Sequence, residues 1–335
     1  MTTRLGLVGV GGIGRAYVAL ARELDGVDLV AVADHDPHAP VRAGLDPAVP
    51  VFAEVDELVR GVDLDAVVVC TPPDTHAEVV VAAVGAGVAV LCEKPLAIRS
   101  QAAQTMIAAA RSAAVPLTMA TKFRFVRDLI AARARVGAGD IGDLIRVENT
   151  FASRVDMTTR WNSDAVVSGG GVVIDNGTHS VDIARYFLGP IAEVLVVEHP
   201  RVQSVAVEDG AQVLLRTAAG TTATIELSWS YDNASDAYLQ LYGTDGTIRI
   251  GWHGAAVRSN ADVTWHPFGT GYDKLACMGA QVTNFVRALR GEETMEISDA
   301  DAIASVQVVE AAYRSLAAGD WTAVESLQAI DEDVA

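Results

Sequence analysis

The chain has 335 residues, half of them hydrophobic, and a formal net charge of −18. A chain of this length can bury a large core and is expected to form two domains. So acidic a protein lacks the basic face that nucleic acid or an anionic membrane requires, and no stretch reaches the length of a membrane span, so we expect neither partner.

Three cysteines, Cys70, Cys92 and Cys277, occur without a CxxC pair. Their odd number and spacing support neither a disulfide framework nor a zinc site, and we expect no metal. Cys70 and Cys92 lie in apolar runs and are expected to be buried thiols. This cysteine usage predicts a reducing, cytoplasmic location.

Residues 4–123 alternate short β-rich runs with helical stretches, as βαβ units do. The runs are continuously apolar, which is typical of strands buried on both faces of a parallel sheet. Residues 1–123 are therefore predicted to form an α/β Rossmann domain with a doubly wound parallel sheet. Thr75 with Glu78 has the spacing of a capping box, and Ser100 is expected to cap a helix. Strands are predicted at 5–10, 28–34, 65–71, 88–93 and 116–123, and helices near 12–24, 76–86 and 100–113.

A glycine-rich turn follows the first predicted strand and opens the first helix. Its GxGxxG spacing permits a tight turn and close approach of a pyrophosphate, to which the helix N-terminus offers backbone donors. Asp34 ends the second strand, where an acid accepts ribose hydroxyls. No arginine adjoins Asp34 to compensate a 2′-phosphate, so NAD is favoured over NADP. The turn residues assigned to the cofactor are Gly9, Gly11, Gly12, Ile13 and Gly14.

Two further segments end strands at the carboxyl edge of this sheet, where ligands of such sheets bind. The first contains Thr71 and Pro72, and the second is Glu93-Lys94-Pro95. Thr71, Pro72, Glu93 and Lys94 are assigned to the cofactor. His76, after the first segment, is either a cofactor contact or merely a residue of the first helical turn, and the second interpretation is favoured.

Lysine is rare in this chain, which has Lys94, Lys122 and Lys274 against 22 arginines. An ammonium in a cleft can be tuned in proton affinity and can donate one compact hydrogen bond to a reacting oxygen, whereas a guanidinium keeps its proton. From Lys94 alone, a catalytic ammonium and a chance residue at a strand end are about equally favoured, and the rest of the chain favours the ammonium. By the same reasoning Lys122 and Lys274 are expected to approach the cleft between the two domains.

From residue 144 onward the pattern changes to alternating strands joined by turns. Residues 124–335 are predicted to form an α+β domain with an open, mainly antiparallel sheet. Ser298 and Asp301 have the spacing of an N-terminal box, and the acidic tail after Gln328 is expected to fray. Strands are predicted at 144–151, 193–199, 211–217, 222–230 and 237–243, and helices near 175–188, 274–290 and 299–318.

Asp175 and His179 lie four residues apart after a triple-glycine turn at 169–171. This spacing places both on one helix face. A carboxylate beside an imidazole fixes its tautomer and raises its basicity, as a general base requires. An isolated pair of this kind is usually a solvated ion pair. Here Asp182 and Tyr186 extend the same face, so the polar stripe is expected to face something other than the core.

Taken in order, the glycine turn, Asp34, the segment 71–76, Glu93-Lys94-Pro95 and residues 169–187 resemble the Gfo/Idh/MocA oxidoreductases, the glucose–fructose oxidoreductase and inositol dehydrogenase group. The resemblance spans the whole chain, and its EKP and DxxxH elements are more specific than the glycine turn. It implies a Rossmann domain, an α+β domain whose open sheet often joins subunits, and a cofactor that crosses between the two.

Lys94, Asp175 and His179 match the catalytic lysine, aspartate and histidine of that family. The resemblance implies that His179 accepts the proton of a secondary alcohol, that Lys94 polarises the alcohol oxygen, and that Asp175 aligns both groups. The hydride passes to C4 of the nicotinamide.

The chain departs from the usual family pattern at Lys122-Phe123-Arg124-Phe125, where the lysine is expected to alter substrate contacts. Aromatic faces suit the apolar side of a sugar ring, and cations or amides suit its hydroxyls. Each candidate could equally be structural, and core packing is favoured for the two aromatic residues. The substrate candidates are Lys122, Arg124, Trp161, Asn162, Tyr272 and Lys274.

The leading hypothesis is an NAD-dependent dehydrogenase that acts on a ring hydroxyl of a sugar, cyclitol or derivative, as a homodimer or homotetramer formed through the second sheet. The alternatives are an NAD-dependent glycoside hydrolase of the same family, a nucleotide-sugar dehydrogenase or ketoreductase, and a non-catalytic nucleotide sensor. The intact catalytic set disfavours the sensor, and net NADH production separates a dehydrogenase from a hydrolase.

Overall fold

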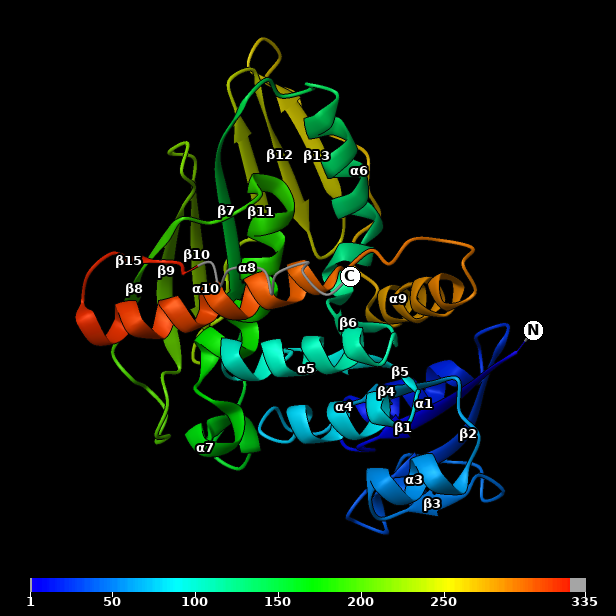
Figure 1. Ribbon diagram of the computed structural model, residues 1–335. Helices are drawn as coiled ribbons and strands as arrows, with labels where there is room; N and C mark the ends of the chain where they lie inside the picture. The colour runs from blue at the N-terminus through cyan, green and yellow to red at the C-terminus, as the bar shows by residue number, and fades with distance from the viewer. Residues whose placement is uncertain (1, 326–335) are drawn as a thin grey trace. The chain divides into compact units, whose positions relative to one another are not determined.

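The computed structural model describes residues 2–325, and the tail after Gln328 lies outside them. Two compact units make up the chain, and both are drawn in Figure 1. The first runs to Thr121 and includes Lys274–Ile303, and the second comprises Lys122–Asp273 and the residues from Ala304 onward. A single division after residue 123 does not describe this arrangement, because residues 274–303 return to the first unit. No helix in the described range is long and apolar enough to cross a membrane.

The first unit contains a six-stranded sheet in the order β3-β2-β1-β4-β5-β6, with every pairing parallel. This is the strand order of a dinucleotide-binding Rossmann sheet, and it confirms the predicted fold class. The sequence missed β3, because a two-residue strand carries no periodicity to detect. The strands are β1 (Thr3–Val8), β2 (Val27–Ala33), β3 (Val51–Phe52), β4 (Ala66–Val69), β5 (Ala89–Glu93) and β6 (Leu117–Ala120), and the helices are α1 (Gly14–Ala21), α2 (Ala39–Arg42), α3 (Val55–Gly61), α4 (His76–Gly85), α5 (Ser100–Ser112) and α9 (Lys274–Leu289).

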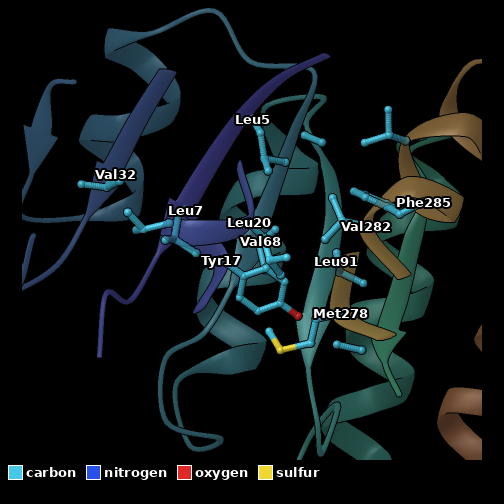
Figure 2. Close-up of a cluster of buried hydrophobic side chains, with 14 of the residues drawn as sticks. Leu5, Leu7, Tyr17, Leu20, Val32, Val68, Leu91, Met278, Val282 and Phe285 are labelled. Carbon is cyan, nitrogen blue, oxygen red and sulfur yellow. The ribbon is translucent and has the colours of Figure 1, made fainter. Parts of the chain in front are cut away.

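Helix α9 belongs to the first unit because its apolar face completes that unit's core. Figure 2 shows Met278, Val282 and Phe285 of α9 beside Tyr17 of α1 and Leu91 of β5. Phe285 is only 1% exposed. Truncating a buried aromatic of this kind to alanine costs about 3–5 kcal/mol, so the returning helix contributes substantially to the stability of the first unit.

The second unit contains a nine-stranded sheet in the order β14-β13-β12-β11-β7-β10-β9-β8-β15. Its pairings are antiparallel except for β7 with β10, which run parallel, so the sheet is mixed and mostly antiparallel as predicted. Its strands are β7 (Leu144–Ala152), β8 (Glu193–Glu198), β9 (Gly210–Arg216), β10 (Thr222–Ser228), β11 (Ala237–Gly243), β12 (Gly246–Gly251), β13 (Ala255–Ser259), β14 (His266–Pro267) and β15 (Thr322–Ala323).

One long helix, α8 (Val172–Leu188), packs against β7 and β10 and carries both Asp175 and His179. In Figure 1 it is the helix labelled α8, coloured green. The remaining helical elements are η1 (Lys122–Phe125), α6 (Arg127–Gly137), η2 (Trp161–Ser163), α7 (Ala165–Ser168) and α10 (Asp299–Ala318), whose first residues belong to the first unit.

Local capping predictions had mixed outcomes. The Ser298 hydroxyl accepts a hydrogen bond from the Asp301 amide at 3.0 Å, and the Asp301 carboxylate accepts one from the Ser298 amide, which confirms that box. The Thr75 box is wrong, because the Thr75 hydroxyl donates to the carbonyl of Pro72 instead of capping α4. Ser100 is the first residue of α5 and follows the capping position.

Candidate active site

The glycine turn after β1 has the geometry of a dinucleotide-binding loop. Gly9 adopts φ +88°, and a Cβ there would lie 2.8 Å from the Cys70 backbone. A Cβ on Gly14 would lie 2.2 Å from the Gly9 carbonyl oxygen, so glycine is required at both positions. Gly11 and Gly12 are exposed, and a Cβ on either would meet nothing within 4 Å. Open space therefore lies over the middle of the turn.

Asp34, at the end of β2, ties this turn to the sheet. Its Oδ2 accepts a hydrogen bond from the Val10 amide at 2.6 Å, and its Oδ1 accepts one from the Asp36 amide at 2.8 Å. A carboxylate offers about four acceptor positions, so two remain for ribose hydroxyls. Asp34 thus holds the loop as well as carrying the charge that the sequence assigned to cofactor recognition.

The turn fits the pyrophosphate of NAD. No acceptor within residues 2–325 takes the backbone amides of Gly11, Gly12 or Ile13. These amides precede α1, whose N-terminus adds a partial positive charge. Donors, open space and the Asp34 carboxylate together suit a dinucleotide.

His76 is the first residue of α4, which is the interpretation that the sequence favours, and its side chain also joins two loops. Its imidazole is fully buried, with Nδ1 2.9 Å from the Pro95 carbonyl oxygen and Nε2 2.9 Å from the Thr71 carbonyl oxygen. Burial lowers the pKa of this imidazole. The ring therefore joins the loop after β4 to the loop after β5.

Glu93 is held by the buried Tyr17, which is held in turn by the buried Gln281. The Tyr17 hydroxyl donates to Glu93 Oε1 at 2.8 Å and accepts a hydrogen bond from Gln281 Nε2 at 3.1 Å. The other carboxylate oxygen of Glu93 accepts from the Lys94 amide at 3.2 Å. Burial, followed by the charge of Glu93, raises the pKa of Tyr17, so this hydroxyl keeps its proton. Lys94 is half-buried, and its backbone amide is held by this Glu93 carboxylate.

The sequence predicts that both thiols near this loop are buried, which is confirmed for Cys92 and holds only in part for Cys70. Cys92 is buried and Cys70 half-buried, and burial followed by the charge of Glu93 raises the pKa of both. A protonated thiol is a poor nucleophile, so neither is a candidate for covalent catalysis.

In the second unit, the first turn of α8 is capped from outside the helix. Glu208 Oε1 accepts hydrogen bonds from the Gly171 amide at 2.9 Å and the Val173 amide at 3.1 Å. The Tyr313 hydroxyl donates to the same oxygen at 2.7 Å and accepts from the Ile174 amide. The helix consequently starts at Val172, three residues before the predicted start. Neither Glu208 nor Tyr313 was identified from sequence, because both are remote from the helix along the chain.

His179 contacts the lysine at which the chain departs from the family pattern. His179 Nε2 lies 3.2 Å from Lys122 Nζ, and the imidazole meets the Phe123 ring edge-on at a centroid distance of 5.1 Å. The histidine is 8% exposed, and its Nδ1 is enclosed. Nε2 is therefore the nitrogen available for proton transfer. Asp175, one turn earlier on α8, is half-buried.

Arg124 makes a buried ion pair, and its assignment as a substrate contact stays a prediction. Its guanidinium makes a bidentate ion pair with Asp182 at 2.9 and 2.8 Å, and the two side chains are only 7% and 1% exposed. The guanidinium carbons of Arg124 and Arg133 both lie under 5 Å from the centre of the Tyr186 ring, as in cation–π contacts. The polar stripe of α8 is thus covered by η1 and α6, and breaking such a pair from one side costs about 3–5 kcal/mol.

The remaining substrate candidates differ in their surroundings. Trp161 is 46% exposed in η2, so core packing does not account for it. Asn162, also in η2, is half-buried, and Lys274 is exposed in the first turn of α9. Tyr272 stacks on Phe123 at 5.3 Å and meets Trp252 edge-on at 5.4 Å. Sequence reasoning missed Trp252, whose role depends on that tertiary contact.

Comparisons with known proteins agree with this geometry. Residues 3–121 match the family described as "Oxidoreductase family, NAD-binding Rossmann fold", and residues 129–249 match the GFO/IDH/MocA C-terminal domain. An inositol 2-dehydrogenase of Rhizobium meliloti is 27% identical, covering 95% of this chain and 98% of the relative. A 1,5-anhydro-D-fructose reductase of Ensifer adhaerens is 31% identical, covering 73% and 74%. The solved structure of a levoglucosan dehydrogenase in complex with NADH has a TM-score of 0.88 at 21% identity, covering 98% and 100%.

Fold, glycine turn and comparisons together define an NAD-binding oxidoreductase. The chain belongs to the Gfo/Idh/MocA family.

Proposed function

We propose that the protein is an NAD-dependent dehydrogenase that oxidises one secondary ring hydroxyl of a neutral sugar, cyclitol or derivative. The observation that carries this proposal is the general base: His179 is held on a capped helix, with Nδ1 enclosed and Nε2 beside an ammonium. The names of the inositol dehydrogenase and anhydrofructose reductase relatives support a polyhydroxylated substrate.

Each of the candidate site residues has a separate role in the proposed reaction. His179 takes the hydroxyl proton at Nε2, and Asp175, on the same face of α8, supports the imidazolium that results. Lys94 donates a hydrogen bond to the same substrate oxygen and so stabilises its developing negative charge. The turn at residues 9–14 and Asp34 hold the dinucleotide, whose nicotinamide supplies the hydride-accepting carbon.

A homo-oligomer is part of the proposal. α8 packs against the second sheet on the face that carries Val213 and Leu215. On the opposite face Leu195 pairs with Leu214 across β8 and β9, both half-buried, and the neighbouring Val197 is 51% exposed. Apolar side chains on an uncovered sheet face favour a second copy of the chain as cover. Light scattering of wild type and Val197→Asp measures the molar mass of each in solution. A smaller mass for the variant supports the proposed interface, and a monomeric wild type would contradict it.

The activity is tested by incubating the protein with NAD and a panel of free cyclitols, monosaccharides and anhydrosugars, and following NADH at 340 nm. We expect net NADH from at least one polyol and none from His179→Asn under the same conditions. Release of an aglycone from glycosides without net NADH would instead identify the NAD-dependent glycoside hydrolase. NADH formation that survives in His179→Asn would remove histidine as the base.

A further inference from the structure

Lys122 places a cation at hydrogen-bond distance from the proposed base. It begins η1, directly after the end of β6, and its Nζ lies 3.2 Å from His179 Nε2 and 5.3 Å from the centre of the Phe123 ring. The lysine side chain is half-buried, and the imidazole beside it is buried. Two basic groups at hydrogen-bond distance share at most one proton along the line that joins them.

The other charged groups around His179 in its own unit are few. Asp175 and Asp182 lie on α8 itself, and Asp182 is fully engaged by Arg124 of η1. The strands that pack against α8 present uncharged residues to it, including Asn149 and Phe151 of β7 and Ile225 and Leu227 of β10.

The carboxylates of these two strands lie on the opposite face of the sheet. Glu148 of β7 accepts a hydrogen bond from Tyr242 there, and Glu226 of β10 accepts one from Tyr231. Lys122, in contrast, contacts the imidazole directly.

The intrinsic basicities of the two side chains decide where the proton resides. A lysine amine is about four pH units more basic than an imidazole in water. The proton between Nζ and Nε2 consequently belongs to lysine, which donates to the lone pair of a neutral imidazole, and the imidazole carries its own proton on the enclosed Nδ1.

We propose that Lys122 is a positioning residue that keeps His179 neutral, with its Nε2 lone pair available as base, at pH values where a histidine without a neighbouring cation would already be protonated. The proposal rests on the proposed function for the role of His179 in turnover. It adds a residue that acts through the base, because a positive charge at 3.2 Å disfavours a second positive charge on the ring. The flexible lysine stem and its three donors let a substrate hydroxyl take the hydrogen bond at Nε2 while the charge stays close.

The test is a direct titration of His179 in the full-length protein without substrate, by NMR of ¹⁵N-labelled histidine, with His179→Asn assigning the signal. Wild type is compared with Lys122→Met, Lys122→Gln and Lys122→Arg. Arg60→Met serves as a matched control, because Arg60 is a surface cation of the first unit paired only with Asp56. The pH dependence of kcat/KM is measured on the same proteins.

We expect the titration midpoint of His179 to rise by about one pH unit or more in the Met and Gln variants, as loss of an adjacent like charge predicts. The midpoint should stay near the wild-type value in Arg60→Met and be largely kept in Lys122→Arg. The acidic limb of kcat/KM should move upward with the midpoint. If one uncharged variant does not fold, the other provides the same comparison.

A His179 midpoint that is the same in wild type and in a folded, uncharged Lys122 variant would overturn the proposal. Absence of net NADH from every polyol tested, together with the expected NMR shift, would overturn the proposed function and leave the Lys122–His179 coupling intact, and full activity in His179→Asn would remove His179 as the base. The two failures are therefore distinguishable.

Discussion

Position 94 carries one of the few lysines in a chain whose cations are otherwise arginines. Lysine and arginine carry the same charge, but only lysine offers a compact donor whose proton affinity can be tuned. We expect Lys94→Arg to fold normally, to bind NAD with nearly unchanged affinity, and to lose about 100-fold or more in kcat, because the planar guanidinium cannot occupy the ammonium position. Steady-state kinetics with NAD titrated separately measures both quantities. A kcat within a few-fold of wild type would show that position 94 supplies charge alone.

Asp34 should determine the choice between NAD and NADP. Its carboxylate would lie next to the additional phosphate of NADP, so we expect much weaker binding of NADP when both cofactors are titrated by intrinsic fluorescence. Asp34→Asn should reduce the difference in affinity between NAD and NADP. It should also weaken the binding of NAD, because the Asp34 carboxylate accepts a hydrogen bond from the Val10 amide in the glycine turn. Asp36→Asn, which removes a neighbouring charge that pairs with Arg42, is the control. Equal affinities of the wild-type protein for NAD and NADP would show that Asp34 does not determine the choice of cofactor.

At the scale of an element, α8 depends on one buried carboxylate. Glu208 is the acceptor for two amides of the first turn of α8, and truncation to alanine leaves both without their partner. We expect Glu208→Ala to lower the free energy of unfolding by about 1–3 kcal/mol. Glu208→Gln keeps a carbonyl oxygen as acceptor and should cost less.

The same residue makes a pH-dependent contribution to stability. Burial raises the pKa of Glu208 in the folded protein, so the folded state retains a proton that the unfolded state has released. Stability from this group is therefore largest below the ordinary glutamate range and falls as pH rises through the raised value. Urea unfolding at several pH values should show this slope in wild type and in Glu78→Gln, an exposed control. The slope should be reduced in Glu208→Gln, and an unchanged slope there would assign it to another group.

For the whole molecule, sequence periodicity was sufficient to predict the fold class and most elements. Both halves carry long buried strands and glycine turns whose patterns are local. The prediction failed where tertiary contacts decide. Nothing in the sequence shows that Asp182 pairs with Arg124, and α9 was assigned to the second half because its packing on the first core is not a local property. The contact of Lys122 with His179 is of the same kind, since 57 residues separate the two.

The structure also strengthens the expectation of an uncharged substrate. The only triple-glycine turn of the chain, at residues 169–171, resembles a phosphate cradle in sequence. Its Gly171 amide is already taken by the Glu208 carboxylate and the Tyr313 hydroxyl, and a carboxylate there disfavours an anion. We therefore expect free cyclitols or monosaccharides to be better substrates than their nucleotide-linked counterparts. A kcat/KM that favours the nucleotide-linked compounds tenfold or more, about 1.4 kcal/mol of transition-state binding, would contradict this expectation.

Hydride transfer from a polyol carbon to NAD is the central claim, and isotope transfer tests it most directly. A polyol substrate found in the NADH screen is deuterated at the reacting carbon and incubated with the protein and NAD, and the reduced cofactor is analysed by NMR. The proposed reaction predicts one deuterium at C4 of the nicotinamide per ketone formed, together with slower turnover than the protiated substrate. Reduced cofactor without deuterium, or a hydrolysis product with no net reduced cofactor, would contradict the account.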